Sequence, residues 1–278
     1  MKKFKAMLDA GHYGKFNRSP ALPSFYESEM TWKLALFWKA ELETYKDVEV
    51  MLTRADQAKD LNEVLRGRMA EGFDLFSSLH ANAPKMDGKT VEEVQGTDYP
   101  AVFVSLDGTV DVLGARLAQT IAAVMGTAQR GQVHKAPWGG RPGVEAYAVL
   151  RGAQEVGCAD RMIIEHSFYT DLRAATWLSD DENLRALAKA EVAVIAEHYG
   201  LEKTEEEAPI VEEEDLFDNA PTPCFEEDIL WAISEGVLLG NEKGDLMLHR
   251  ACTREETVAI VRRAVRALLR EEKECAPM

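Results

Sequence analysis

Four short segments of the 278-residue chain carry side chains suited to metal or hydrolytic chemistry. They are residues 8–14 (LDAGHYG), 27–29 (ESE), 77–82 (SSLHAN) and 163–168 (IIEHSF). His12 and His80 each follow an apolar run that is typical of a strand. If the two strands are neighbours, both imidazoles reach the same edge of a sheet. Neutral imidazole is a common zinc ligand, so this pair indicates part of a metal site.

Two carboxylates accompany the histidines. Glu29 opens the helix predicted after the His12 loop, and Glu165 ends a predicted buried strand. One carboxylate would complete a three-ligand zinc site with a position open for water, as in catalytic zinc sites. Glu165 at a strand end is suited to taking a proton from that water and passing it to a leaving group. Because such dispersed ligands have no fixed spacing, a hydrogen-bonded structural role for each histidine stays open.

The segments that must position these residues alternate between two periodicities. Strand patterns cover residues 4–9, 48–53, 74–80, 101–105 and 162–165. Helical spacing covers residues 29–45, 61–70, 112–125, 144–156 and 179–199, with Asp60 as a predicted N-cap and Ser179 and Glu182 as a predicted capping box. This alternation predicts an α/β fold: a mostly parallel or mixed sheet with helices on both faces.

Composition excludes several classes of function. The formal net charge is −16 with no basic stripe, which argues against a nucleic-acid partner. No apolar run approaches the roughly 18 residues of a membrane span, so no membrane partner is expected. The N-terminal lysines run into Asp9 without an apolar signal region, so we expect synthesis in a cytoplasm. The four cysteines form no CxxC pair and are expected to be free thiols.

The acidity is concentrated near the C-terminus, and this predicts three parts of the chain. Residues 201–278 carry a net charge of −11. We predict a catalytic domain over residues 1–200, an acidic linker over 201–222 and a small helical module over 223–278.

In this order, the four segments resemble those of the zinc-dependent N-acetylmuramoyl-L-alanine amidases of bacteria and phages. The matching residues, in chain order, are 8–14 (LDAGHYG), a Glu at the head of the first helix, Leu52-Thr53-Arg54 with Asp56, 78–82 (SLHAN), Arg130-Gly131 and 165–168 (EHSF) with Asp171. The resemblance covers about residues 3–199. Tyr13 replaces the more usual glycine.

The resemblance implies a zinc ion held by His12, Glu29 and His80, with Glu165 as the catalytic carboxylate. It implies hydrolysis of the peptidoglycan amide that joins N-acetylmuramic acid to L-alanine. Glu29 is preferred as the ligand because the helical periodicity falls in phase behind it, while Glu27 stays an alternative. His166 points to the opposite face from Glu165 if the strand is regular, as a residue that supports the site or as a surface residue.

The C-terminal part weakly resembles one S-layer-homology repeat, through Trp231-Ala232-Ile233, spaced glycines and 253–256 (TREE). That resemblance implies binding to a secondary wall polymer, and self-association or a stabilising hairpin are the alternatives. The whole chain is predicted to be a phage endolysin that degrades the cell wall after release from the cytoplasm. A zinc peptidase acting on stem peptides and a non-catalytic wall-binding protein are the rival interpretations.

Overall fold

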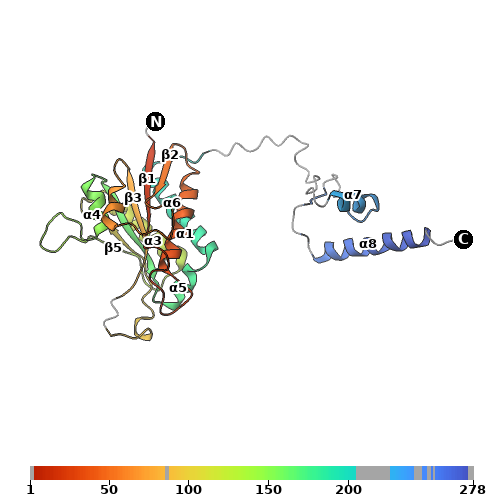
Figure 1. Ribbon diagram of the computed structural model, residues 1–278, viewed down its shortest axis with the longest axis horizontal. Coiled ribbons are helices and arrows are strands. Elements are labelled where there is room, and N and C mark those ends of the chain that lie inside the picture. Colours follow the sequence, from red (N-terminus) through yellow and green to blue (C-terminus); the bar gives the residue numbers. More distant parts are fainter. Residues whose placement is uncertain are drawn as a thin grey trace. The chain divides into compact units, whose positions relative to one another are not determined.

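A computed structural model describes most of the chain in two separate units. The described residues are 3–84, 88–204, 226–240, 246–248, 252 and 254–274. The first compact unit is Met1–Thr204 and the second is Glu205–Met278 (Figure 1). Most of the predicted acidic linker lies outside the described residues.

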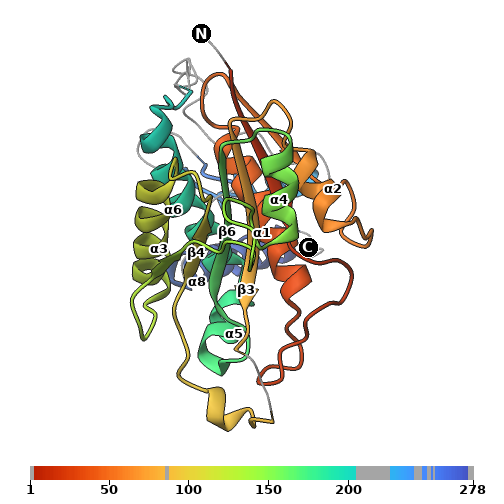
Figure 2. The same ribbon diagram turned by 90° about the vertical axis from the view of Figure 1, so that its left-hand side faces the viewer.

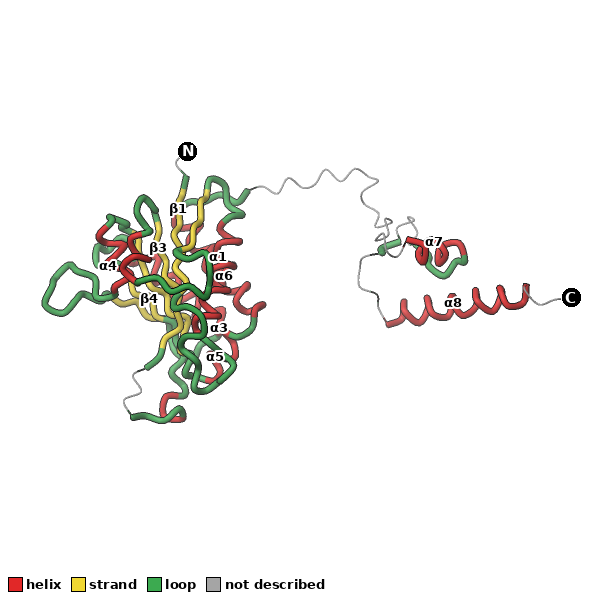
Figure 3. Tube along the Cα trace, viewed as in Figure 1, coloured by secondary structure: helices red, strands yellow, loops and turns green. Residues whose placement is uncertain are grey.

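The first unit is built on one mixed sheet of six strands, shown in yellow in Figure 3. The strands are β1 (Phe4–Ala10), β2 (Val48–Leu52), β3 (Leu75–Asn82), β4 (Ala101–Val104), β5 (Gln132–His134) and β6 (Asp160–Phe168). Their order across the sheet is β2-β1-β3-β6-β4-β5. The first four in this order are parallel, whereas β4 runs antiparallel to β6 and pairs in parallel with β5. The carboxyl ends of β1, β3 and β6 therefore meet at one edge.

Helices cover both faces of this sheet, which confirms the predicted α/β class. On one face α1 (Glu27–Leu42), α3 (Asp111–Met125) and α6 (Asp181–Tyr199) pack on the larger apolar core. On the other face α2 (Glu63–Arg68) and α4 (Ala148–Glu155) pack together on a smaller core, in front of the strands in Figure 2. A turn of 3-10 helix, Glu92–Val94, and α5 (Leu172–Leu178) complete the unit.

Successive side chains along the central strands point alternately into these two cores. In β6, Ile164 lies in the larger core and Ile163 in the smaller one. In β1, Leu8 and Met7 divide in the same way. A strand buried on both faces shows a continuous apolar run, which is why these strands could be recognised in the sequence.

Several predicted helix starts were wrong. The first helix begins at Glu27, two residues before the predicted Glu29. The N-cap of α2 is Asn62 rather than Asp60, because the Asn62 carboxamide accepts from the N–H groups of Val64 and Leu65. The N-cap of α6 is Asp180 rather than Ser179. In α2 and α6 a polar residue one or two positions away replaces the predicted cap.

A series of fully buried polar side chains links β6, α6 and α1. His166 Nε2 lies 2.8 Å from Glu191 Oε1, and Glu191 Oε2 accepts a hydrogen bond of 2.8 Å from Trp38 Nε1. His166 Nδ1 donates to the carbonyl of His80 at 2.9 Å. Burial lowers the pKa of His166, but the charge and hydrogen bond of Glu191 outweigh it, so the net shift is upward. His166 is therefore a buried residue that supports the His80 backbone, and not a surface residue.

We expect Glu191→Ala to lower the free energy of unfolding by about 3–5 kcal/mol, because it removes one partner of a buried ion pair. The matched control is Glu197→Ala on the same helix, whose exposed side chain should change stability by no more than about 0.5 kcal/mol. Urea unfolding of both variants measures the difference. Equal losses of stability in the two variants would contradict a structural role for the hydrogen-bonded side chains of His166, Glu191 and Trp38.

The described part of the second unit contains α7 (Glu226–Ser234) and α8 (Arg254–Glu274). Val258, Val261 and Val265 of α8 are at least half exposed. Two residues of the S-layer resemblance, Gly244 and Thr253, lie outside the described residues. Among the helices that the structure describes, none is long and apolar enough to cross a lipid bilayer.

Candidate metal centre and active site

Two histidines meet at the carboxyl edge of the sheet. His12 follows the end of β1 with φ of +59°, and His80 lies near the end of β3. Their ring centroids are 4.9 Å apart and their planes are nearly perpendicular. Gly11 permits this approach, because a Cβ at that position would clash with the imidazole of His80. The two predicted metal-ligating histidines are thus brought together.

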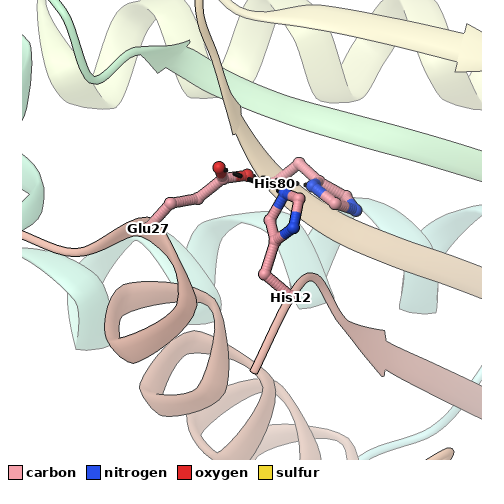
Figure 4. A group of neighbouring side chains, drawn as sticks. All are labelled: His12, Glu27 and His80. Atoms are coloured by element: carbon pink, nitrogen blue, oxygen red, sulfur yellow. Dashed lines mark hydrogen bonds and ion pairs between the residues drawn. The ribbon is translucent and has the colours of Figure 1, made fainter. Parts of the chain in front are cut away.

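The third member of the cluster is Glu27, the first residue of α1. Its Oε1 lies 2.9 Å from His80 Nδ1, and its Oε2 lies 3.3 Å from His12 Nε2 (Figure 4). One ligand atom from each of these three residues lies within 4.8 Å of the other two. The Glu27 side chain is only 1% exposed. In the described part of the chain this is the one group of three or more such side chains close enough to hold a metal ion.

The structure places Glu27, and not the predicted ligand Glu29, beside the two histidines. Glu29 instead borders a small cavity beside Leu178 and Leu184, against the helices that follow β6. Two residues along an α-helix turn the side chain by about 200°, so the two glutamates cannot point the same way. The sequence prediction had placed the start of this helix two residues late.

Glu27 is ionised at neutral pH. Burial raises its pKa, but hydrogen bonds and charges from His12 and His80 more than compensate and lower it to about 2. The backbone N–H of Ala81 also donates to Oε1 at 3.0 Å. A carboxylate held in its charged form between two imidazoles is a donor set of the kind that binds zinc.

Glu165 lies beside this cluster. It pairs with His80 in the register of β3 and β6, so both side chains leave the same face of the sheet. Its Oε2 is buried and has no hydrogen-bond partner among the described residues. Burial and the negative charge of Glu27 raise the pKa of Glu165 well above its usual range. An unpaired buried carboxyl with a raised pKa is typical of a group that exchanges protons during catalysis.

Two further site residues were not predicted. Burial, with the charges of Glu27 and Glu165, raises the pKa of Tyr169 to about 12. The amide of Asn17 contacts Glu27 and His12. Neither residue belongs to a recognisable catalytic or metal-binding motif. Each is brought to the site by the conformation of its loop, which the sequence pattern does not predict.

A second buried network fixes the end of β1 that carries His12. Asp9 accepts hydrogen bonds from Arg66, Thr53 and Ser78 at 2.6–2.9 Å. Arg54 donates to the carbonyl of Ala10 at 2.6 Å. Thr53 and Arg54 therefore hold the end of this strand in place.

The chain thus has an α/β fold whose mixed sheet carries, at its carboxyl edge, two imidazoles and two carboxyl groups that form a candidate metal centre. The chain belongs to the N-acetylmuramoyl-L-alanine amidase family, because the model of that family matches residues 6–197. A comparison with curated proteins finds no match.

Solved amidase structures share the fold at low sequence identity. The N-acetylmuramoyl-L-alanine amidase from Clostridium difficile 630 is 20% identical, with a TM-score of 0.59 over 72% of this chain and 98% of that one. The catalytic domain of CwlV from Bacillus (Paenibacillus) polymyxa var. colistinus is 19% identical, with a TM-score of 0.57 over 72% and 99%. The amidase AmiC2 of Nostoc punctiforme is 21% identical, with a TM-score of 0.57 over 71% and 97%. At this identity the likeness supports the fold and leaves the residue roles to be argued from the site.

Proposed function

We propose that this protein is a zinc-dependent amidase that hydrolyses the bond between N-acetylmuramic acid and the L-alanine of the peptidoglycan stem peptide. The observation that carries the proposal is the cluster of His12, Glu27 and His80 beside Glu165, within a chain of the amidase family. The cluster supplies the metal ligands, and Glu165 supplies a proton-transfer group next to them.

The donor set fits zinc. Two imidazoles and one carboxylate are a common catalytic combination, and three protein ligands leave one tetrahedral position open. A zinc ion bound there would act as a Lewis acid on the scissile carbonyl and lower the pKa of water. The three side chains come from β3, from α1 and from the loop after β1, so folding of the sheet edge assembles them.

Glu165 is proposed to carry the proton through the reaction. Its carboxylate takes a proton from the attacking water as the new C–O bond forms. The carboxyl group then gives that proton to the α-amino nitrogen of L-alanine as the C–N bond breaks. The products are a free lactyl carboxylate and a stem peptide with a new amino terminus. A raised pKa suits both directions of transfer near neutral pH.

The finer biological assignments stay predictions. These are the endolysin role, synthesis in a cytoplasm, and wall-polymer binding or self-association of the C-terminal module. The separation of that module into its own compact unit supports testing it apart from the catalytic chemistry.

The test of the proposal is digestion of purified peptidoglycan, followed by mass spectrometry of the new ends. We expect free muramic lactyl groups and new N-terminal L-alanine, lost on chelation and restored by added zinc. Cleavage within the stem peptide would instead identify a zinc peptidase. An absence of cleavage in every wall type, with zinc bound, would favour the wall-binding alternative.

A further inference from the structure

A β-bulge interrupts β6 directly after Glu165. The pair His80–Glu165 is followed by the pair Asn82–Phe168, so two residues of β6 lie opposite one residue of β3. A bulge bends its strand and redirects the side chains beside it, and bulges are frequent next to active sites. The shape of this bulge therefore determines the direction in which the Glu165 side chain leaves the sheet.

Ser167, the second residue of the bulge, has an unusual backbone conformation. Its φ is +67°, in the left-handed region, which costs a serine more than a glycine. The residue is also fully buried. Backbone strain persists only where surrounding contacts hold it, and strained residues cluster at functional sites. The contacts of Ser167 therefore decide whether the bulge keeps its shape.

Asp98 supplies the side-chain contact that holds Ser167. The Ser167 hydroxyl donates to Asp98 Oδ1 at 2.7 Å. The other carboxylate oxygen accepts from Arg173 Nη1 at 2.7 Å and from the backbone N–H of Ala128 at 3.1 Å. The Asp98 side chain is only 2% exposed, and hydrogen bonds to a buried carboxylate are strong. Through Asp98 the bulge is tied to α5 and to the loop after α3.

The first residue of the bulge is held by a different carboxylate. His166 Nε2 lies 2.8 Å from Glu191 Oε1, and both residues are fully buried. The two side chains of the bulge thus each end at a buried acidic group, Glu191 for His166 and Asp98 for Ser167. Two separate anchors fix the bulge and, with it, the backbone of the preceding residue, Glu165.

We propose that Ser167, through its hydrogen bond to Asp98, is a positioning residue that keeps the Glu165 carboxyl group beside the proposed metal ligands. The inference rests on the proposed function, because it takes Glu165 as the proton-transfer group. Glu165 Oε2 has no hydrogen-bond partner among the described residues, so the place of the carboxyl group depends on the backbone that carries it. Proton transfer requires hydrogen-bond reach, so a small displacement of that backbone lowers the rate.

The variants Ser167→Gly and Ser167→Ala test this assignment. Both remove the hydroxyl; glycine accepts the left-handed backbone, whereas alanine keeps its strain. Ser105 is the matched control, because it is also fully buried and its hydroxyl lies 3.2 Å from Thr109 Oγ1. The N–H of Ser105 donates to the carbonyl of Arg161, near the amino end of β6 and so away from Glu165. Ser105→Gly and Ser105→Ala repeat the loss of a buried hydroxyl there.

The measurement is kcat and KM of the full chain on a soluble muramoyl-peptide substrate at saturating zinc. Zinc content and the midpoint of urea unfolding show that each variant is loaded and folded under the assay conditions. We expect both Ser167 variants to lower kcat about 10–100-fold, as a displacement of about 1 Å can do, with KM and zinc content as in the wild type. Both Ser105 variants should keep the wild-type kcat. A wild-type kcat in Ser167→Gly would overturn the proposal even if Ser167→Ala were slow, since backbone strain alone would then explain the alanine variant.

The double variant Ser167→Gly/Glu165→Gln separates positioning from a general structural effect. If Ser167 acts through Glu165, removal of the carboxyl group removes its influence, so the double variant should cleave as fast as Glu165→Gln alone. A structural effect on the whole site would instead slow Glu165→Gln by the same factor as the wild type. That result would contradict the positioning role.

The outcomes distinguish this inference from the proposed function. A slow Glu165→Gln variant, together with full kcat in Ser167→Gly, would overturn the role of Ser167 alone. Full activity in Glu165→Gln, or no amide cleavage by the wild type, would overturn both. A loss in Ser167→Gly that disappears in the Glu165→Gln background, with unchanged Ser105 variants, establishes the positioning role.

Discussion

The Glu165→Gln variant should cleave peptidoglycan about 10²–10⁴-fold more slowly than the wild type, which is the usual contribution of a general acid–base group. Glutamine keeps the size and shape of the side chain but cannot accept and release the proton. The rate is measured by the release of new L-alanine amino termini at saturating zinc. We expect a large effect on the chemical step because Glu165 lies beside the proposed metal ligands and its pKa is raised.

The same variant should leave the metal site and the fold intact. Glu165 Oε2 makes no hydrogen bond to the described residues, so the substitution breaks none at that atom. Zinc content and the midpoint of urea unfolding should therefore match the wild type. Glu182→Gln, a substitution of a largely exposed side chain on α6, is the control for the charge change. Full activity in Glu165→Gln would remove Glu165 from the mechanism.

Much of the fold was predictable because the central strands are buried on both faces. β1 and β6 contain the short apolar runs 6–8 and 162–164, and the helices on each side follow the expected spacing. β5 was not predicted, since it has three residues and its pattern is mostly exposed. The short helix α5 was also missed, because its seven residues lie in a segment that carried no periodic signal long enough to use.

The candidate site was predictable where a candidate residue lies near the carboxyl end of a strand or just after it. His12, His80 and Glu165 are such residues, and the topology brings their strands together. The contacts of His166 could not be predicted, because its partner Glu191 lies on another element and becomes a neighbour only through packing. Asn17 was missed for the same reason.

The choice between Glu27 and Glu29 shows how a small error in a helix boundary becomes a large error in a candidate site. Two glutamates stand two residues apart at the start of α1. The helix rotation between them sends one toward the histidines and the other toward α5 and α6. Sequence patterns locate helix ends to within a few residues. The assignment therefore needed the extended backbone of Tyr26, which fixes Glu27 as the first helical residue.

Glu27→Gln and Glu29→Gln should consequently behave in opposite ways. Glu27→Gln removes a negative charge and a ligand oxygen from the cluster, so we expect zinc affinity to fall by more than about 100-fold, beyond the usual loss for a residue that only orients a ligand. Amidase activity should fall with it at limiting zinc. Glu29→Gln changes a group outside the cluster and should retain both properties.

The two variants are matched in chemistry, in helix and in position near its start, so each controls the other. Zinc titration by competition with a chelator and peptidoglycan digestion at fixed free zinc measure the pair side by side. Loss of zinc in Glu29→Gln, with retention in Glu27→Gln, would restore the assignment based on periodicity and contradict the geometry of the cluster. The opposite result would establish that the first residue of α1 completes the metal site, since only from that position does the carboxylate reach both His12 and His80.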